Sequence, residues 1–367
     1  MRKFLMLLFI TFLVIACQES KKGKEPLTTI INDSIISEHD GRCLQCFSLS
    51  KETKDTTLLI NNEPYVLTYS SVIDTSETLT QIDVYSSNGK NYKDIFRGYN
   101  AYYTVSLKDS NRHTIFSKKF LKKEFGGDSY DKSIVVESGA NMPKFKGYLS
   151  KFDSFLFTLE FWVPDSDIGL ECFFMLDRKG NIIKNFVNNW FGGGDCDGTI
   201  EVSPSKDFIL TCRSIINTNG KIVNLDKEDV GLVCTKLIND SIILVIEQFN
   251  DTTKLPNAIL MNNFGKVLKK FNYQGYYNVL GYIVPIRYDS RSENYYLFDQ
   301  TLKNIRTINR DRPLGSEALR LDLIESYDGN QRAHEVKVVF KTEGRANNFY
   351  IDSITQQIRY EGGIGKK

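Results

Sequence analysis

The chain has 367 residues, of which 41% are apolar and 25% charged, and these proportions are typical of a folded protein. Its 47 Lys and Arg are balanced by 45 Asp and Glu, whereas a nucleic-acid-binding protein usually carries a basic excess or a basic stripe. The composition also excludes intrinsic disorder, a collagen helix and a coiled coil, and the length allows two domains or one large repetitive domain.

A short hydrophobic segment lies at the N-terminus. Arg2 and Lys3 precede residues 4–16, in which only Thr11 is not apolar. A helix of this length spans roughly 20 Å, which is less than the roughly 30 Å hydrocarbon core of a bilayer. The segment therefore predicts a signal peptide over residues 1–16 and not a permanent membrane span.

This segment ends in Val14-Ile-Ala-Cys17. The motif resembles the lipobox of bacterial lipoproteins, in which an aliphatic and a small residue precede the lipidated cysteine. The resemblance implies that Cys17 carries diacylglyceryl and N-acyl chains, and Gln18 after it implies sorting to the outer membrane. Residues 17–48 are then a lipidated tether and linker, and the lipid makes the membrane a partner. The alternative is a plain secretory signal followed by an unrelated cysteine.

Six further cysteines allow up to three disulfides in an oxidising compartment. They are Cys43, Cys46, Cys172, Cys196, Cys212 and Cys234. Cys43 and Cys46 form a CxxC motif with no βαβ pattern, second CxxC or neighbouring histidine pair, so a local disulfide is favoured over a redox dithiol or half a zinc site. Cys172 and Cys212 each precede a turn glycine by eight residues and are interpreted as small buried side chains or as a bridge.

The remaining chain has the periodicity of β strands. Apolar residues alternate from Phe155 to Phe161 and predict a strand with one aromatic face. Residues 242–246 are all apolar, which indicates a strand covered on both faces. Residues 316–324 place Leu319, Leu321 and Leu323 on one face of a further strand. Because no stretch keeps helical spacing, we expect an all-β chain connected by hairpins.

A hairpin motif recurs along the chain: an apolar strand, an Asn- or Asp-rich turn and a second apolar strand. Gly180, Gly220 and Gly265 occupy the turn position that needs positive φ in three copies. Residues 295–305 and 349–358 repeat the pattern without glycine, and residues 81–90 form an earlier candidate copy. The first apolar residue after the turn recurs at Ile182, Ile222, Val267, Ile305 and Ile358. This spacing is close to the roughly 40–50 residues of a four-stranded propeller blade.

In these hairpins the chain resembles bacterial β-propellers, and residues 56–185 are similar to uncharacterised all-β domains that follow lipoboxes in Bacteroides-type lipoproteins. We therefore predict two domains. The first is an antiparallel β-sandwich-like or barrel-like domain over residues 49–190, and the second is a β-propeller-like repeat domain over residues 191–367. The alternative is one seven-bladed β-propeller over residues 50–367.

Catalytic motifs are largely missing from the sequence. It contains no Gly-x-Ser-x-Gly elbow and no phosphate-binding loop, and His334-Glu335 lacks the second histidine of a zinc helix. Ser129-Tyr-Asp-Lys132 fits Ser-x-x-Lys, but we expect a turn at this position after Gly126-Gly127 and not the helix start that would aim the serine. No catalytic residue, metal or cofactor is predicted.

Two pairs of residues could bind a ligand. Asp195 and Asp197 lie in a Gly-rich turn whose carboxylates could hold Ca²⁺, although the surrounding residues do not complete an EF-hand and a plain turn is favoured. Trp190 and Phe191 could stack on a sugar or peptide ring, although a core position is favoured for aromatic residues at this density.

Two function classes fit these observations. The first is a lipid-anchored, non-catalytic binding or scaffolding module that holds a protein, glycan or peptide at the outer membrane, on its periplasmic or external side. The second is a propeller-type hydrolase or lyase that acts on polysaccharide or peptide through paired carboxylates. The lack of a nucleophile motif favours the first class. Cleavage before Cys17 would remove Arg2 and Lys3 and leave 45 basic and 45 acidic side chains, so the lipid and not charge would hold the protein at the membrane.

Overall fold

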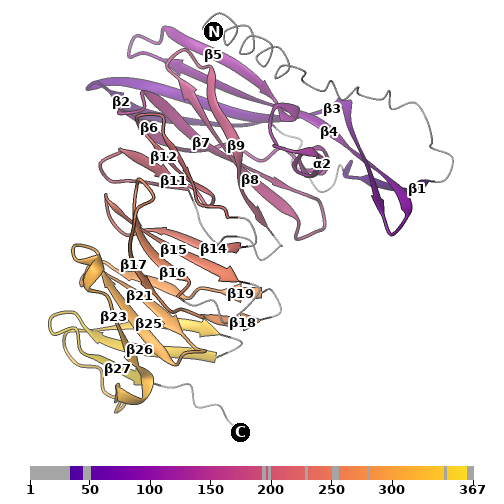
Figure 1. Cartoon of the computed structure of the whole chain (residues 1–367). Helices are drawn as coiled ribbons and strands as arrows, with labels where there is room; N and C mark the ends of the chain where they lie inside the picture. The colour runs from indigo at the N-terminus through magenta and orange to yellow at the C-terminus, as the bar shows by residue number, and fades with distance from the viewer. Residues whose placement is uncertain are drawn as a thin grey trace, which may run out of the picture. The chain divides into compact units, whose positions relative to one another are not determined.

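The computed structural model describes residues 34–43, 51–191, 196, 200–227, 230–249, 256–278, 281–342 and 345–361 (Figure 1). The predictions for Cys17, Cys46, Asp195 and Asp197 therefore lie outside the described residues. The described chain divides into two compact units, of which the smaller consists of residues 34–37 and 84–93. All the sites discussed below lie in the larger unit.

The first sheet contains the two longest described strands, of 25 and 19 residues. Its members are β1 (Ser34–Asp40), β2 (Glu52–Ile60), β3 (Glu63–Ser87), β4 (Lys90–Lys108) and β5 (Thr114–Leu121). The strand order is β1-β4-β3-β2, and β5 pairs with β4. A 3₁₀ turn, η2 (Lys122–Glu124), and an α-helix, α2 (Ser129–Glu137), follow β5.

Three four-stranded antiparallel sheets come next in the chain, each ordered as in the sequence. Their strands are β6 (Lys144–Leu149), β7 (Ser154–Trp162), β8 (Gly169–Asp177) and β9 (Ile182–Phe191); β10 (Glu201–Val202), β11 (Phe208–Leu210), β12 (Ser214–Asn217) and β13 (Ile222–Asn224); and β14 (Val230–Leu237), β15 (Ile242–Phe249), β16 (Ala258–Asn262) and β17 (Val267–Phe271). They can be followed by colour in Figure 1.

The C-terminal part contains a two-stranded sheet and two more four-stranded sheets. The strands are β18 (Tyr276–Asn278) and β19 (Gly281–Ile283); β20 (Ile286–Asp289), β21 (Asn294–Asp299), β22 (Asn304–Asn309) and β23 (Glu317–Arg320); and β24 (Glu325–Ser326), β25 (Glu335–Thr342), β26 (Arg345–Asp352) and β27 (Ile358–Glu361). The last sheet has the order β24-β27-β26-β25, and β24 runs parallel to β27. The all-β prediction with propeller-like four-stranded repeats is confirmed.

The predicted repeat turns have the expected backbone conformation. Gly180, Gly220 and Gly265 have φ of 77°, 81° and 83° and connect β8 to β9, β12 to β13 and β16 to β17. Lys303 and Gln356 take the same left-handed conformation in the two copies that lack glycine. The hairpin signal was therefore correct in all five copies, because the turn conformation is a local property of the chain.

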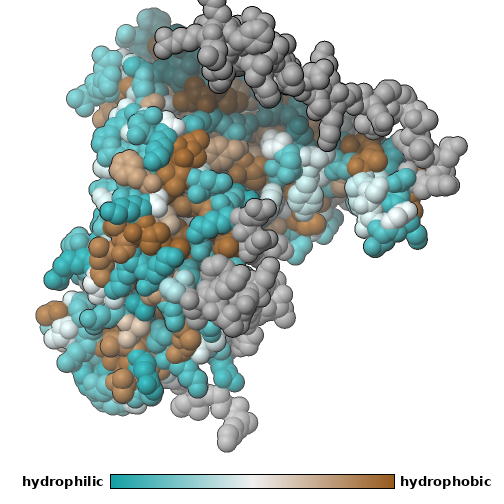
Figure 2. All heavy atoms as spheres, viewed as in Figure 1, coloured by the Kyte–Doolittle hydropathy of each residue, from teal (hydrophilic) through white to brown (hydrophobic). Residues whose placement is uncertain are grey.

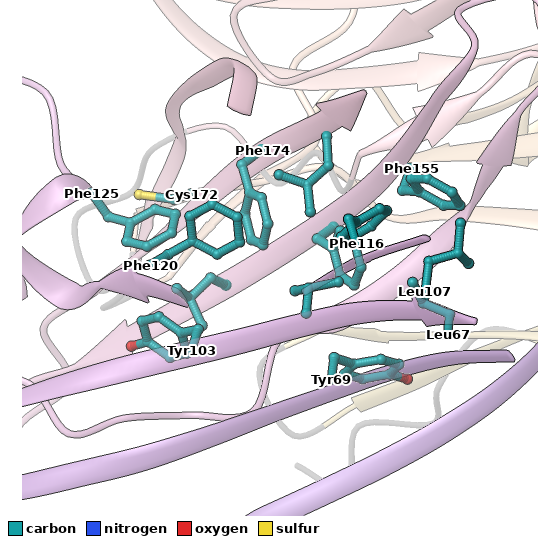
Figure 3. Close-up of a cluster of buried hydrophobic side chains, with 14 of the residues drawn as sticks. Leu67, Tyr69, Tyr103, Leu107, Phe116, Phe120, Phe125, Phe155, Cys172 and Phe174 are labelled. Atoms are coloured by element: carbon teal, nitrogen blue, oxygen red, sulfur yellow. The ribbon is translucent and has the colours of Figure 1, made fainter. Parts of the chain in front are cut away.

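Hydrophobic clusters join successive sheets. The aromatic face of β7, from Phe155 to Phe161, packs in the cluster shared with the first sheet, whereas Leu156 packs on the opposite side against Ile209 and Ile216. Figure 3 shows the first of these clusters. In β15, Leu244 belongs to one cluster and Ile243 to another, so the prediction of a strand covered on both faces is confirmed. The sheet β6–β9 thus packs on sheets from both predicted domains, and the boundary at residues 190–191 stays a prediction.

The continuous strand predicted over residues 316–324 is wrong. β23 ends at Arg320, and Leu321–Leu323 form the 3₁₀ turn η4, which begins with a backbone hydrogen bond from Leu321 N to Lys303 O (2.9 Å). Leu323 is 77% exposed. The chain leaves one sheet at this point and enters the next at β24, a change of direction that the alternation of leucines does not reveal.

The turn predicted at Ser129 is also wrong. Asp128 has an extended backbone and accepts a hydrogen bond from Asp131 N (3.0 Å), so that Asp128 is the N-cap of α2. Asp131 Oδ2 in turn accepts from Gly127 N and Asp128 N, at 3.0 and 3.3 Å. This reciprocal capping stabilises a nine-residue helix whose sequence has only a weak apolar face.

Candidate functional site

A cavity of about 520 Å³, here called the tryptophan cavity, opens beside the edge strand β6. It is lined by Lys54, Tyr69, Asn141, Met142, Pro143, Lys144, Phe145, Glu160 and Trp162. Its lining comes from β2, β3, β6, β7 and the segment before β6, so the fold brings together residues more than one hundred positions apart. Its volume lies in the range of small-molecule sites.

Trp162 is held in one orientation by its neighbours on the sheet. Gly169 of β8 pairs with Trp162 of β7 on one side and with Phe191 of β9 on the other. Because Gly169 has no side chain, the two rings stack, with centroids 4.5 Å apart and planes inclined by 5°. A Cβ on Gly169 would lie 2.9 Å from the Trp162 ring. Trp162 remains 38% exposed, so the sheet presents a fixed, accessible indole to the cavity.

Polar groups of both signs surround this indole. Lys144 Nζ forms an ion pair with Glu160, and Asn141 Nδ2 donates to the backbone oxygen of Glu160 (3.0 Å). The ring of Tyr69 is only 3% exposed and packs edge-on against Phe157, with centroids 5.7 Å apart. The hydroxyl of Tyr69 makes no hydrogen bond to any described residue. The cavity therefore combines an aromatic surface with donors and acceptors that a ligand can use.

Two further cavities adjoin each other farther along the chain. The arginine cavity, of about 870 Å³, is lined by residues 239–242, Glu293 and residues 310–315, and the tyrosine cavity, of about 440 Å³, is lined by Glu201, Val202, Pro204, residues 237–239, Tyr288, Tyr295 and Arg310. They share Asn239 and Arg310. Asn239 Nδ2 donates to Arg310 O (2.6 Å) and so fixes the loop after β14 against the loop after β22.

The glutamates in these cavities form ion pairs with basic side chains. Arg310 Nη1 donates to Glu293 (3.0 Å), and the Tyr288 hydroxyl donates to the same carboxylate. The hydrogen bond from Tyr288, together with Arg310, holds the pKa of Glu293 below its usual value. Glu201 forms an ion pair with Lys236 and accepts from Leu237 N (2.6 Å). Glu293 is therefore a poor candidate for a general acid, because its contacts stabilise the charged form.

Ser129 does not form the predicted Ser-x-x-Lys pair. Its hydroxyl donates to Asp83 and accepts from Gln81 Nε2 (3.0 Å), and Lys132 is not among its hydrogen-bond partners in the described residues. Ser129 is the first residue of α2, which the sequence analysis did not expect. Among the described residues, no group of three or more His, Cys, Asp and Glu side chains could hold a metal ion.

Trp190 and Phe191, the predicted aromatic pair, have different surroundings. Trp190 Nε1 donates to Asp131 Oδ1 (2.7 Å), and the Arg213 guanidinium lies over its ring at 4.2 Å. Trp190 is thus occupied by intramolecular contacts, whereas Phe191 supports Trp162. Sequence reasoning missed Trp162. The signal available was a glycine, Gly169, opposite a tryptophan near the end of a predicted strand.

The described cysteines differ in their bonding. Cys196 and Cys212 form a disulfide with a Cα–Cα distance of 5.8 Å, which links the segment before β10 to the loop after β11. Cys172 is a buried free thiol, and burial raises its pKa to about 12. Of the two interpretations kept open for Cys172 and Cys212, the small buried side chain applies to Cys172, whereas Cys212 is bridged to Cys196 and not to Cys172. Cys43 is disulfide-bonded, and its pairing with Cys46 stays a prediction because Cys46 lies outside the described residues.

Glu171 is one of the buried carboxyl groups that have a perturbed pKa and lie outside these three cavities. Glu171 is 8% exposed and accepts from Asn188 Nδ2 (2.7 Å), while Asn188 Oδ1 accepts from Cys212 N (2.9 Å). Burial raises the pKa of Glu171, and the hydrogen bond from Asn188 opposes this rise. The chain of bonds links β8 and β9 to the disulfide loop, so we assign Glu171 a structural role.

This role predicts a pH-dependent effect of Glu171→Gln. An acid with a raised pKa binds more protons in the folded state than in the unfolded state, so its contribution to stability falls as pH rises above about 4.3. We expect Glu171→Gln to match the wild type in urea unfolding near pH 4 and to be more stable at pH 7. A gap that does not change between these two pH values would contradict the buried, protonatable carboxyl.

Comparisons with known proteins place this chain in no family. No protein-family model matches it, and no curated protein matches its sequence. Solved structures with a similar arrangement include a streptogramin B lyase (11% identity, TM-score 0.30, 86% of this chain and 88% of that one) and a protein of unknown function from Bacteroides thetaiotaomicron (12%, 0.26, 79% and 78%). The β-propeller domain of Cps50 (Swd1) from Myceliophteria thermophila is another (10%, 0.28, 53% and 68%). We base no inference on likenesses of this size.

The described surface is mixed in character. Figure 2 shows hydrophobic residues interspersed among hydrophilic ones on the face in view. Among the helices of the described residues, none is long and apolar enough to cross a membrane.

Proposed function

We propose that this chain is a lipid-anchored lipoprotein of the outer membrane whose β sheets form a non-catalytic binding module. The motif Val14-Ile-Ala-Cys17 after a thirteen-residue hydrophobic segment supports the anchor. Two or three acyl chains on one cysteine would attach the chain firmly, because each buried methylene contributes about 0.8 kcal/mol. The partner is a protein or glycan, and no nucleic acid is expected.

The observation that carries a binding role over a catalytic one is the pairing of the cavity glutamates. Glu160, Glu201 and Glu293 each contact a lysine or arginine, at Lys144, Lys236 and Arg310 respectively. A glycoside hydrolase or lyase would instead need one carboxyl held protonated beside an ionised partner. Fixed side chains of both signs, next to accessible aromatic rings, are suited to holding a ligand in one orientation.

The anchor is tested by Cys17→Ala in a Gram-negative host. We expect the wild-type chain to enter the detergent phase in a phase-separation assay and the variant to remain in the aqueous phase, because the variant lacks the thiol that carries the lipid. Ser20→Ala, in the same segment, should partition like the wild type. Equal partitioning of the Cys17 variant and the wild type would overturn the lipoprotein assignment.

A further inference from the structure

We infer that the tryptophan cavity is a carbohydrate-binding site in which a sugar ring packs against Trp162. The inference rests on the proposed binding function and adds a ligand class to it. Three features of the cavity carry it: the fixed indole, the hydroxyl of Tyr69, which is unpaired among the described residues, and the balance of polar groups around them.

The indole offers a flat apolar surface with little freedom to move. Stacking on Phe191 over the bare backbone of Gly169 fixes the Trp162 ring before any ligand arrives. A pyranose ring has one flat face of C–H groups, and its hydroxyls project from the rim. Such a face packs well on an aromatic ring, and a ring that is already ordered loses little conformational entropy on binding.

The hydroxyl of Tyr69 points independently to a ligand with hydrogen-bonding groups. Tyr69 is 3% exposed, and its hydroxyl makes no hydrogen bond to any described residue although the residue lines the cavity. The ring is buried, whereas the oxygen is not among the described buried side-chain atoms that lack a partner, so the hydroxyl is accessible to water or a ligand. In Figure 3 the ring and oxygen of Tyr69 lie at the lower edge of the labelled hydrophobic cluster. This group can both donate and accept a hydrogen bond, as can the hydroxyl of a sugar.

The remaining polar groups match a ligand that carries donors and acceptors side by side. Lys54 and Lys144 supply donors, Glu160 supplies acceptors, and the amide of Asn141 supplies both. The Lys144–Glu160 ion pair leaves no strong excess of one charge at the rim. The volume of about 520 Å³ accommodates one or two sugar units of a longer chain.

The edge of the sheet argues against a peptide in extended conformation. Strand addition needs a continuous row of N–H and C=O groups on an edge strand. β6 is the edge strand here, but Pro143 precedes it without an N–H, and the register shifts between Phe145 and Gly147, where φ is 134°. A compact ring fits this site better than an added strand.

The test uses the full chain in a detergent without a sugar headgroup, with cellotetraose, maltotetraose and chitotetraose as probes. The chain has two tryptophans, so Trp190→Phe leaves Trp162 as the only reporter. We expect at least one probe to change the emission of Trp162 saturably in this variant. Trp162→Ala, measured by calorimetry with the same probe, should bind at least tenfold more weakly than the wild type.

The tyrosines provide a matched pair of variants. Tyr69→Phe removes only the hydroxyl in the cavity and should weaken binding several-fold without lowering the unfolding midpoint. Tyr103 is fully buried, and its hydroxyl also makes no hydrogen bond to a described residue, but it lies in the hydrophobic core and not among the cavity residues. Tyr103→Phe should therefore bind the probe as the wild type does.

Three results would overturn the inference. If Trp162→Ala binds the probe as tightly as the wild type, the tryptophan cavity is not the binding site, and the proposed binding function lies elsewhere in the chain. If none of the three oligosaccharides changes the fluorescence or produces heat of binding, carbohydrate is not the ligand class. Competition by decaproline for the change in Trp162 emission would assign the cavity to a peptide. None of these results affects the partitioning of Cys17→Ala, so the anchor is judged separately.

Discussion

Replacing Lys122 by methionine will lower the free energy of unfolding by roughly 3–5 kcal/mol, because three buried carbonyl groups lose their hydrogen-bond donor at once. Lys122 has an exposed fraction of 0%, and its ammonium donates to Tyr99 O (3.0 Å), Val136 O (2.9 Å) and Ser138 O. Two of these carbonyls lie at the C-terminal end of α2, where backbone oxygens have no partner within the helix. Methionine fills the space of the side-chain stem but donates no hydrogen bond.

Urea unfolding followed by tryptophan fluorescence measures this loss. Lys123→Met is the matched control, since Lys123 is the neighbouring residue of the same 3₁₀ turn and is exposed. Its unfolding free energy should stay within about 0.5 kcal/mol of the wild type. A loss of equal size in both variants would contradict the assigned role of Lys122.

The effect of Lys122 also depends on pH. Burial lowers the pKa of this amino group to about 7, and the charge of Glu137 opposes the shift. Between about pH 7 and pH 10 the unfolded chain therefore binds more protons at this lysine than the folded chain, and the contribution of Lys122 to stability rises with pH. The gap between the wild type and Lys122→Met should widen over this interval. A constant gap would show that the pKa of Lys122 is not lowered.

Leu244→Ala will destabilise the protein by about 3–5 kcal/mol through the cavity that it leaves. Leu244 is fully buried in β15, a strand with hydrophobic clusters on both faces, so neighbouring side chains have little room to close the gap. Leu319→Ala removes the same atoms from β23, where the leucine is 41% exposed. The control should lose no more than about 0.5 kcal/mol in the same urea titration. Similar losses at both positions would contradict the two-sided burial of β15.

The β strands and repeat turns could be predicted because their signals are local. Alternation from Phe155 to Phe161 places every second side chain on one face of β7, whatever lies opposite. An unbroken apolar run at residues 242–246 stabilises the fold only if hydrophobic neighbours cover both faces of the strand. The two-sided burial could therefore be predicted without knowing which sheets provide it. Positive φ at Gly180, Gly220 and Gly265 follows from turn geometry over a few residues.

The candidate site could be predicted only in part. The sequence singled out Phe191 together with Trp190, but the accessible indole is Trp162, and it depends on Gly169 lying between two strands. Tyr69 joins the same cavity from the first sheet, more than seventy residues before Glu160 and Trp162. Periodicity shows which side chains share a face of one strand, but it does not show which strands of another sheet come to lie beside them.

Taken by itself, the sequence determined the all-β class, the hairpin turns and the buried strands, since these depend on residues within one or two strands of each other. It also contains the motif Val14-Ile-Ala-Cys17, on which the proposal of lipidation at Cys17 rests. Only the tertiary structure decided that Asp128 caps a helix, that Lys122 satisfies its C-terminal end and that Trp162, Gly169 and Phe191 form one rigid surface. These features bring distant segments together, and their free energy comes from contacts that exist only once the sheets have packed.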